Sequence, residues 1–271
     1  MTGPQEKLQR LEALLREMGR VAVAFSSGVD STFLLYAAHR VLGEDAVAVT
    51  ALSSVFPRNE REEADAFCKE HGIRQLTLAF DPMEIPIFRE NPRDRCYHCK
   101  TALFTRIRGL AEENGFPFVL EGTNVDDLGD YRPGLRAIEE LNIQSPLKDA
   151  GLTKEDIRIL SRDAGLPTWN KPSFACLASR FVYGETIDTK KLSMVEQAES
   201  YLSGLGLHQY RVRIHGLLAR IETEPQELEH LVSPDIREPL YDYFRSLGFS
   251  YITLDLKGYR TGSMNENNRT T

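Results

Sequence analysis

Short apolar segments that suit β-strands alternate with longer segments that suit helices through the first half of the chain. Val21, Val23 and Phe25 are β-branched or aromatic residues at every second position, as in a strand with one buried face. Thr32–Leu42 has the length and apolar content of a helix packed on a sheet. Further strands are predicted at residues 46–53, 74–80 and 116–123, separated by helices over residues 31–42, 58–71 and 100–114. This alternation predicts an α/β fold, with a parallel sheet and helices on both of its faces.

A second region with a different order of elements begins near residues 183–186. It is predicted to contain a helix at 190–206, one strand at 210–222, a helix at 236–248 and a strand at 251–257. This order suggests a small α+β unit, so we predict two domains, residues 1–183 and 184–271. The segment Gly258–Thr271 is polar and rich in Gly and Asn, and its end is predicted to be disordered.

The turn after the first strand has the residues of a phosphate-binding loop, FSSGVDS at Phe25–Ser31. Gly28 has no Cβ, so the backbone can approach an anion, and successive N–H groups and the positive helix end point to one place. The hydroxyls of Ser26, Ser27 and Ser31 add donors. No lysine precedes Ser31 and the glycine spacing differs, which excludes the Walker A and GxGxxG patterns. The alternative is a strand–turn–helix corner without a ligand.

The composition indicates the class of protein and its compartment in the cell. The chain has 271 residues, 41% of them hydrophobic and 27% charged, which fits an intracellular enzyme of one or two domains. No run approaches the roughly 18 apolar residues of a membrane span, and Met1–Arg20 reads as a charged helix rather than a signal peptide. We therefore expect a cytoplasmic protein with no membrane partner. The net charge of −7 also argues against a large nucleic-acid surface.

The four cysteines differ in their surroundings. Cys68 lies on the apolar face of a predicted helix, where a small buried thiol is the ordinary explanation. Cys96 and Cys99 form a CxxC in RDRCYHCK, and Cys176 lies far away in KPSFACLASR. In a reducing compartment a CxxC indicates metal or redox chemistry rather than a structural disulfide.

Three explanations compete for the CxxC, beside chance clustering. A zinc site needs four ligands, and only His71 and His98 lie close in sequence to complete one. A redox dithiol would follow the first strand of a small βαβ unit, whereas this pair follows the Pro-rich loop at 81–92. The third explanation is an iron–sulfur cluster held by the pair and Cys176, with one iron lacking a protein ligand.

The phosphate loop resembles the SGGxDS signature of the PP-loop ATP pyrophosphatases. These enzymes hold the β,γ-pyrophosphate of ATP and transfer AMP to an acceptor oxygen. Ser27 stands where the signature has its first glycine. A serine can supply the same backbone N–H if its φ stays negative, so this departure bears on the geometry of the loop rather than on the class of enzyme.

Six segments spread over the chain carry a distinctive set of residues. They are FSSGVDS, RCYHCK, EGTNVDDLGDYRPG, KPSFACLASR, RVRIHG and LDLKGYRTGSMN, between about Val21 and Met264. Together they resemble the LarE family of ATP-dependent sulfur transferases. The resemblance implies a step in making the nickel-pincer nucleotide cofactor of lactate racemase, in which carboxylates of a pyridinium biscarboxylic acid mononucleotide are adenylated and converted to thiocarboxylates.

The adenylation chemistry can be assigned to residues on this resemblance. Ser26–Ser31 would hold pyrophosphate, and Asp30 would help to hold Mg²⁺ on the phosphates. Nucleotide contacts are expected where the fourth strand ends, at Gly122, Asn124 and Asp126. Lys100 and Arg180 are candidates for neutralising the developing phosphate charge. The alternative for Asp126 and its neighbour Asp127 is that they cap a helix or turn.

The source of sulfur divides the family that the chain resembles. In one branch the residue matching Cys176 attacks the acyl-adenylate and loses its sulfur, leaving dehydroalanine. In the other branch three cysteines resembling Cys96, Cys99 and Cys176 hold a 4Fe-4S cluster, and a sulfide on the open iron is transferred. Because all three cysteines are present, the cluster route is favoured, with the sacrificial route as its alternative.

Two arginines in the second region suit a phosphate monoester, which the family's substrate carries. Arg211 and Arg213 alternate with apolar residues, so both guanidinium groups emerge on one face of a strand. Glu199 on the preceding helix either orients one of these arginines or is an exposed helical carboxylate. The alternative is a solvated strand face. This region is also the expected contact of a homo-oligomer.

Two rival functions come from other classes. A tRNA thiolase also combines a PP-loop with a CxxC and a distant cysteine, but it needs a basic RNA-binding surface. A non-catalytic ATP-binding protein would explain the loop and leave the cysteines and arginines without a use. An ATP-dependent amide ligase is a further possibility, although no glutaminase segment is evident.

Overall fold

The computed structural model describes residues 3–53, 55–56, 58–129, 133–172 and 175–260. The chain divides into two compact units, with residues 1–84 and 94–174 in unit 1 and residues 85–93 and 175–271 in unit 2. The short segment 85–93 joins unit 2 through Asn91, whose side-chain amide donates to the carbonyls of Val182 (2.7 Å) and Glu185 (3.2 Å). The division of function between residues 1–183 and 184–271 stays a prediction.

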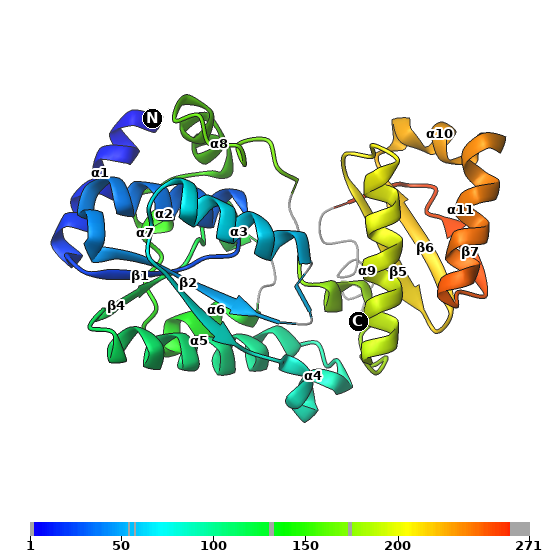
Figure 1. Ribbon diagram of the computed structural model, residues 1–271, viewed down its shortest axis with the longest axis horizontal. Helices are drawn as coiled ribbons and strands as arrows, with labels where there is room; N and C mark the ends of the chain where they lie inside the picture. Colours follow the sequence, from blue (N-terminus) through cyan, green and yellow to red (C-terminus); the bar gives the residue numbers. More distant parts are fainter. Residues whose placement is uncertain (1–2, 54, 57, 130–132, 173–174, 261–271) are drawn as a thin grey trace. The chain divides into compact units, whose positions relative to one another are not determined.

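Unit 1 is built on a four-stranded parallel sheet of order β3-β2-β1-β4. Its strands are β1 Val21–Ala24, β2 Ala46–Leu52, β3 Gln75–Ala79 and β4 Phe118–Leu120. Its helices are α1 Pro4–Met18, α2 Val29–Leu42, α3 Arg58–Glu70, α5 Arg95–Glu113, α6 Pro133–Glu140, α7 Pro146–Asp149 and α8 Lys154–Asp163. The predicted α/β PP-loop fold is confirmed by this sheet and its flanking helices (Figure 1).

Alternate residues of the central strand feed two apolar cores, one on each face of the sheet. Val21 and Val23 pack with α1, α2, α3 and α8, whereas Ala22 faces the core made with α5 and α6. The arrangement follows from the side-chain period of two along a strand. Each fully buried large apolar side chain stabilises the unit by about 1.5–3 kcal/mol, so this double core holds the carboxyl ends of β1 and β4 in fixed register.

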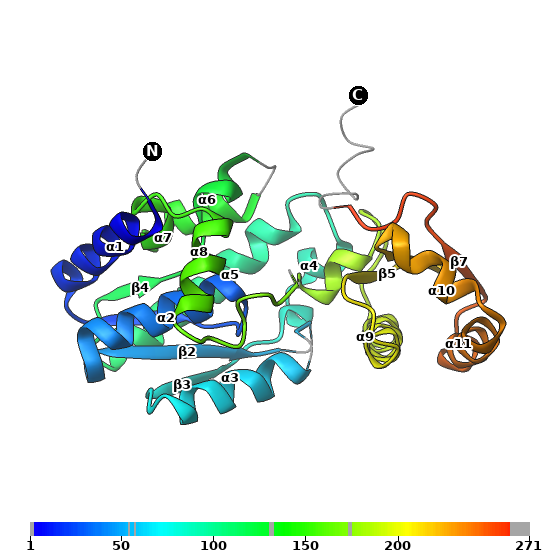
Figure 2. The same cartoon turned by 90° about the horizontal axis from the view of Figure 1, so that it is seen from above.

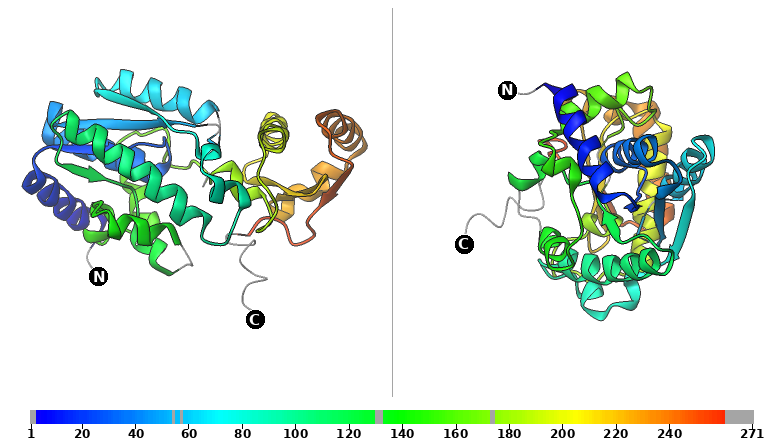
Figure 3. Two further views of the ribbon diagram at one scale, coloured as in Figure 1. Left: turned by 90° about the horizontal axis from the view of Figure 1, so that it is seen from below. Right: turned by 90° about the vertical axis from the view of Figure 1, so that its left-hand side faces the viewer.

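Unit 2 contains a three-stranded sheet of order β5-β6-β7. Its strands are β5 Tyr210–His215, β6 Leu218–Thr223 and β7 Tyr251–Leu254, and its helices are α4 Pro86–Glu90, α9 Thr189–Gly204, α10 Leu228–Val232 and α11 Pro234–Leu247. The two long helices α9 and α11 lie side by side on one face of this sheet (Figures 2 and 3). Tyr201 and Tyr243 join them with rings stacked 4.5 Å apart. The α+β character predicted for this region is therefore present.

The single strand predicted over residues 210–222 is wrong. The segment forms an antiparallel hairpin, in which His215 of β5 pairs with Leu218 of β6. Gly216 lies in the turn with φ of +63°, a left-handed backbone that glycine adopts without steric conflict. The apolar pattern continues through the turn, so periodicity alone did not reveal the reversal.

No helix among the described residues combines the length and the apolar content needed to cross a membrane. The end of the tail predicted to be disordered, residues 261–271, lies outside the described residues, as do residues 130–132 and 173–174 of the segments that carried the family resemblance.

Candidate functional site

The predicted phosphate loop connects β1 to α2 and folds closely on itself. The hydroxyls of Ser26 and Ser31 lie 3.1 Å apart, and the Ser31 hydroxyl donates to the carbonyl of Gly28 at 3.3 Å. Gly28 is the N-cap of α2, and a Cβ added there would lie 3.5 Å from Ser26 Oγ. Two hydroxyls and the first N–H groups of a helix therefore meet at the carboxyl end of a parallel strand, as in an anion site.

The backbone of Ser27 is left-handed. Its φ is +53°, so the condition of a negative φ is not met. A left-handed backbone costs a non-glycine residue about 1–2 kcal/mol, which contacts around it must offset. The Ser27 hydroxyl donates to the carbonyl of Glu60 on α3 at 2.9 Å, and the residue is 2% exposed. The loop thus keeps the backbone typical of glycine while carrying a serine.

The residues predicted after the fourth strand do come together with the phosphate loop. The Asn124 amide donates to Asp30 Oδ1 at 3.3 Å, and the Asp126 N–H donates to Asn124 Oδ1 at 2.9 Å. Gly122 allows this approach, because a Cβ there would lie 3.1 Å from both Asp30 Cβ and the Ser31 nitrogen. Gly122, in the segment that follows β4, therefore packs closely against the start of α2, and its predicted nucleotide contact stays a prediction.

Lys154 is a member of this site that the sequence reasoning missed. Its ammonium forms an ion pair with Asp30, and its backbone N–H donates to Asp126 Oδ2 at 2.8 Å. It is the first residue of α8, where Thr153 and Asp156 form a capping box. The capping residues in the sequence predict the helix start, but nothing local indicates that this start lies beside a loop 124 residues away.

The environment of Asp30 sets its protonation. Burial raises the pKa of this carboxyl, and the charge of Lys154 opposes that rise. Among the described residues, no three His, Cys, Asp or Glu side chains gather as metal ligands, so the predicted Mg²⁺ role of Asp30 stays a prediction.

Replacing Lys154 with methionine should raise the pKa of Asp30 further, because the cation that favours the carboxylate is removed while the burial remains. The protein would then bind a proton at Asp30 at a higher pH than the parent does. Carbon-13 NMR titration of labelled aspartate measures this shift. Lys148→Met, which alters the exposed pair with Asp149 on α7, is the control and should leave Asp30 unchanged. An unchanged or lower Asp30 pKa in Lys154→Met would contradict the assignment.

Cys96 and Cys99 lie in the first turn of α5, three positions apart and therefore on one face of the helix. Cys96 is exposed and Cys99 half-buried, and the buried guanidinium of Arg95 lies 3.9 Å from Cys96 Sγ. This arrangement suits two thiolates that ligate one group. Cys176 belongs to unit 2, so the three-cysteine ligand set stays a prediction. Burial raises the pKa of the Cys68 thiol to about 12, which makes it a neutral core residue.

Lys100 lies one residue beyond the cysteine pair on α5. A Cβ on Gly134 of α6 would lie 2.7 Å from Lys100 Cδ, so its alkyl chain packs closely over that glycine. Its ammonium is 5.9 Å from the centre of the Phe104 ring. Its predicted role toward phosphate stays a prediction.

Arg180 is fully buried in unit 2 and holds the Cys176 loop. Its guanidinium binds both carboxylate oxygens of Glu199, at 2.8 and 2.7 Å. The third nitrogen donates to the carbonyls of Ala175 (2.6 Å) and Cys176 (3.2 Å) and to Ser179 Oγ (2.9 Å). Burial disfavours both charges, but their attraction outweighs it, so the pKa of Arg180 is raised and that of Glu199 lowered. These contacts favour a positioning role for Arg180, and they make Arg180 the direct ion-pair partner of Glu199.

Arg213 and Arg211 lie on β5 as predicted, and both are buried, so the alternative of a solvated strand face is wrong. Arg213 pairs with Glu222 of β6 at 2.9 Å, and its Nη1 donates to the Ser179 carbonyl at 3.0 Å. The Ser179 contact places this arginine at the loop that carries Cys176.

The surroundings of Arg211 disfavour its charge. Its Nη1 donates to the Tyr210 carbonyl at 2.6 Å, and its guanidinium carbon lies 5.3 Å from the centre of the Tyr259 ring. Burial, followed by the nearby charge of Arg180, lowers the pKa of Arg211 to about 10. A buried cation with a lowered pKa gains from an added anion.

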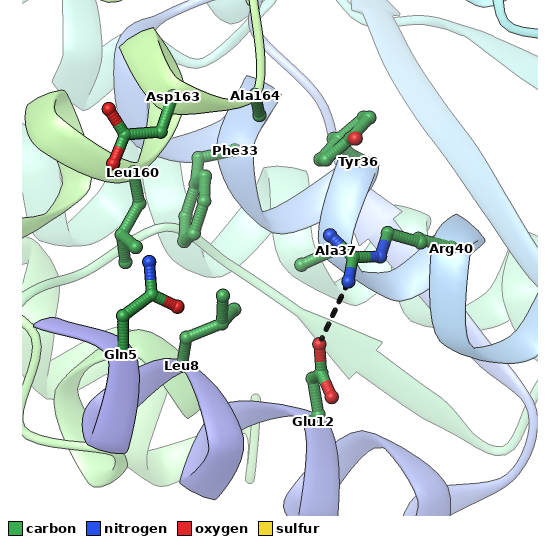
Figure 4. A pocket seen from close by; sticks show the side chains of 10 residues that line it. All are labelled: Gln5, Leu8, Glu12, Phe33, Tyr36, Ala37, Arg40, Leu160, Asp163 and Ala164. Atoms are coloured by element: carbon green, nitrogen blue, oxygen red, sulfur yellow. Dashed lines mark ion pairs between the residues drawn. The ribbon is translucent and has the colours of Figure 1, made fainter.

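A cavity of about 200 Å³ lies elsewhere in unit 1, between α1, α2 and α8 (Figure 4). Phe33 and Leu160 form apolar walls, and Glu12 pairs with Arg40 at 3.8 Å at its edge. None of the residues predicted from the sequence lines this cavity, so it is separate from the phosphate loop.

Known proteins are similar to this chain in sequence. No protein-family model matches the chain. It is 41% identical over 261 residues to an uncharacterized protein of Synechocystis sp., with 96% of this chain and 97% of that protein aligned. It is 38% identical over 262 residues to the pyridinium-3,5-bisthiocarboxylic acid mononucleotide synthase of Lactiplantibacillus plantarum, covering 96% of this chain and 94% of the synthase. A more distant relative, one of the subunits of the glutamine-hydrolyzing GMP synthase of Methanopyrus kandleri, is 25% identical over 59% of the chain and 54% of its own length.

The alignment with the synthase extends over both units. Such identity over nearly the whole of both proteins establishes common ancestry and a common fold. The chain belongs to the LarE family, the family of the pyridinium-3,5-bisthiocarboxylic acid mononucleotide synthase.

Proposed function

We propose that the protein is an ATP-dependent sulfur transferase that adenylates carboxylates of pyridinium biscarboxylic acid mononucleotide and converts them to thiocarboxylates. The product would serve the nickel-pincer cofactor of lactate racemase. The observation that carries the proposal is the 38% identity to a synthase whose name states this product. The phosphate loop of unit 1 and the cysteine and arginine cluster of unit 2 supply residues for the two halves of the reaction.

The first half would take place at the phosphate loop. A carboxylate resists attack by sulfur because its leaving group is poor, and transfer of AMP makes a mixed anhydride with a good one. The N–H groups at the start of α2, with Ser26 and Ser31, would bind the pyrophosphate. Asp30 would help to hold Mg²⁺ on the phosphates, in which case Lys154 shares its carboxylate with the metal or moves to a phosphate oxygen.

Unit 2 would hold the phosphate of the substrate nucleotide. Arg211 and Arg213 are buried cations on neighbouring positions of one strand face, and two guanidinium forks match the oxygens of a phosphate monoester. The lowered pKa of Arg211 supports this role, since binding a dianion would relieve the repulsion from Arg180.

The second half of the reaction would centre on Cys176. The residue is half-buried at the N-cap of the short helix Leu177–Arg180, and Arg180 fixes the carbonyls of the loop from within unit 2. A loop held at its backbone presents the sulfur in a constant direction. Cys176 would either attack the acyl-adenylate itself or serve as the third ligand of a cluster.

A 4Fe-4S cluster on Cys96, Cys99 and Cys176 is the favoured form of the proposal. The two helix thiols on one face of α5 fit such a group, and Arg95 beside Cys96 supplies an N–H donor toward a thiolate. When bound, the cluster would supply an iron without a protein ligand that can carry the transferable sulfide. This chain's own part is to hold the cluster and to bind and activate the carboxylate.

The proposed function is tested by incubating the protein with ATP, Mg²⁺ and pyridinium biscarboxylic acid mononucleotide. Mass spectrometry should detect replacement of carboxylate oxygen by sulfur, and pyrophosphate should be released in step with it. A mononucleotide without a free carboxylate is the control and should release none. Absence of pyrophosphate release with the acid substrate would favour a non-catalytic ATP-binding protein instead.

The sulfur source has a separate measurement, iron and acid-labile sulfide in protein purified without oxygen. We expect about four of each per chain, as in a 4Fe-4S cluster, and loss of both in Cys96→Ala. The matched control is Cys68→Ala, since Cys68 is a buried core thiol. Protein with no iron that still forms thiocarboxylate would contradict the cluster and leave Cys176 as the sacrificial donor.

A further inference from the structure

Lys171, the first residue of the KPSFACLASR segment, contacts the phosphate loop, and the proposed chemistry gives it no role. Its ammonium donates to the carbonyl of Ser27 at 3.1 Å and forms an ion pair with Glu63 of α3. The side chain is 12% exposed. Arg158 of α8 fixes the backbone behind it, because its guanidinium donates to the Lys171 carbonyl at 2.9 Å and to that of Trp169 at 2.7 Å.

A contact at the Ser27 carbonyl affects the orientation of the whole Ser27–Gly28 peptide. In a trans peptide the C=O and the next N–H point in opposite directions, so the Lys171 contact also sets the direction of the Gly28 N–H. Gly28 is the N-cap of α2, where the anion-binding N–H groups begin. A rotation of this one peptide would turn that donor away from the point at which the others converge.

Ser27 also needs support because of its backbone. At a φ of +53° a serine is strained where glycine would not be. Its hydroxyl is held by the Glu60 carbonyl and its own carbonyl by Lys171, which Glu63 holds in turn. Glu60 and Glu63 are one turn apart on α3, so a single helix supports both sides of the strained residue.

We propose that Lys171 is a positioning residue of the nucleotide site, which holds the Ser27–Gly28 peptide in its anion-binding orientation and so allows a serine at a glycine-type backbone position. This inference rests on the proposed function, in that the anion is taken to be the pyrophosphate of ATP. Lys171 acts through the loop backbone, and Glu63 acts through Lys171.

The test is a cycle of four proteins: the parent, Lys171→Met, Ser27→Gly, and the double variant. Calorimetry measures the Kd for ATP with Mg²⁺. We expect Lys171→Met to raise the Kd about tenfold in the parent, and less than about threefold in the Ser27→Gly background, where glycine adopts the backbone unaided. Equal factors in the two backgrounds would overturn the inference and indicate that Lys171 binds a phosphate directly. The control is Lys69→Met, which replaces an exposed lysine on α3 and should leave the Kd unchanged.

Two further measurements keep the test decisive. Glu63→Gln retains the lysine and alters an exposed carboxylate, so it should fold and raise the Kd in the same direction by a smaller factor. The amide signal of Gly28 reports its orientation without any nucleotide, and Lys171→Met should shift it and speed its hydrogen exchange. Absence of ATP binding by the parent would defeat the proposed function, whereas an unchanged Gly28 amide in Lys171→Met would overturn the positioning role by itself.

Discussion

Replacement of Cys176 by alanine should abolish thiocarboxylate formation while pyrophosphate release from ATP continues. The expected loss is complete, because both forms of the proposed sulfur transfer use this sulfur, and alanine has none. Adenylation should persist, since the phosphate loop, Asp30 and Asn124 all belong to unit 1, whereas Cys176 lies in a loop of unit 2. Mass spectrometry of the product and an assay for pyrophosphate, run on the same reaction, measure the two steps separately.

The two sulfur sources predict different results for Cys96→Ala. A sacrificial Cys176 would leave one turnover per chain intact in this variant, and the spent protein would have lost the mass of hydrogen sulfide at Cys176. A cluster would make Cys96→Ala as inactive as Cys176→Ala. Cys68→Ala should behave as the parent because that thiol is buried, with a pKa of about 12. Thiocarboxylate formed by Cys176→Ala would refute both routes.

The fold of unit 1 could be predicted because the alternation of side chains along each strand agrees with a sheet that has helices on both faces. Val21 and Val23 alternate with Ala22, and the structure places them on opposite faces of the sheet. The same pattern misled the prediction at residues 210–222, since apolar residues continue through the turn at Gly216. A hairpin of this kind depends on one glycine backbone, and hydrophobic periodicity carries no information about it.

The part of the candidate site that lies at the ends of parallel strands could be predicted from the sequence. Asn124 and Asp126 follow a parallel strand beside the one that precedes Asp30, so the topology itself brings them together. Lys154 and Lys171 approach the same loop from the start of α8 and from the segment after it, and no spacing rule connects them with residues 26–31. The positive φ of Ser27 has no local signal either, because it depends on contacts from α3 and from Lys171 that offset its strain.

Loss of Arg180 should have the largest effect on stability. The residue is fully buried and pairs with Glu199 through two hydrogen bonds, so Arg180→Met leaves a buried carboxylate without its main partner. Breaking such a pair costs about 3–5 kcal/mol of unfolding free energy. Denaturant unfolding at neutral pH measures it. Replacing both partners with methionine should restore much of the loss, because an apolar pair buries no lone charge.

The stability deficit of Arg180→Met should also depend on pH, in a direction that follows from the pKa of Glu199. In the parent, burial raises the pKa of Glu199, but Arg180, Arg211 and the Val212 N–H together lower it more, so the carboxylate stabilises the fold above its unfolded pKa, near the ordinary value of 4.5. Without Arg180 the burial dominates and the pKa in the folded protein lies above the unfolded value. The deficit of Arg180→Met should therefore be largest at neutral pH and shrink as acidification protonates Glu199. A deficit that stays constant with pH would indicate lost packing rather than a lost ion pair.

Arg211 provides the matched contrast within the same cluster. Its pKa is lowered by burial and by Arg180, so its charge adds little to the stability of the free protein, and Arg211→Met should change the unfolding free energy by less than about 1 kcal/mol. The same substitution should raise the KM for the phosphate-bearing substrate more than it affects a substrate analogue without phosphate. Equal stability losses in Arg180→Met and Arg211→Met would remove the distinction between a structural arginine and an anion-binding one. With the predicted pattern, Arg180 is paired with Glu199 and holds the carbonyls of the Cys176 loop directly, and its neighbour Arg211 contributes its charge to binding the substrate.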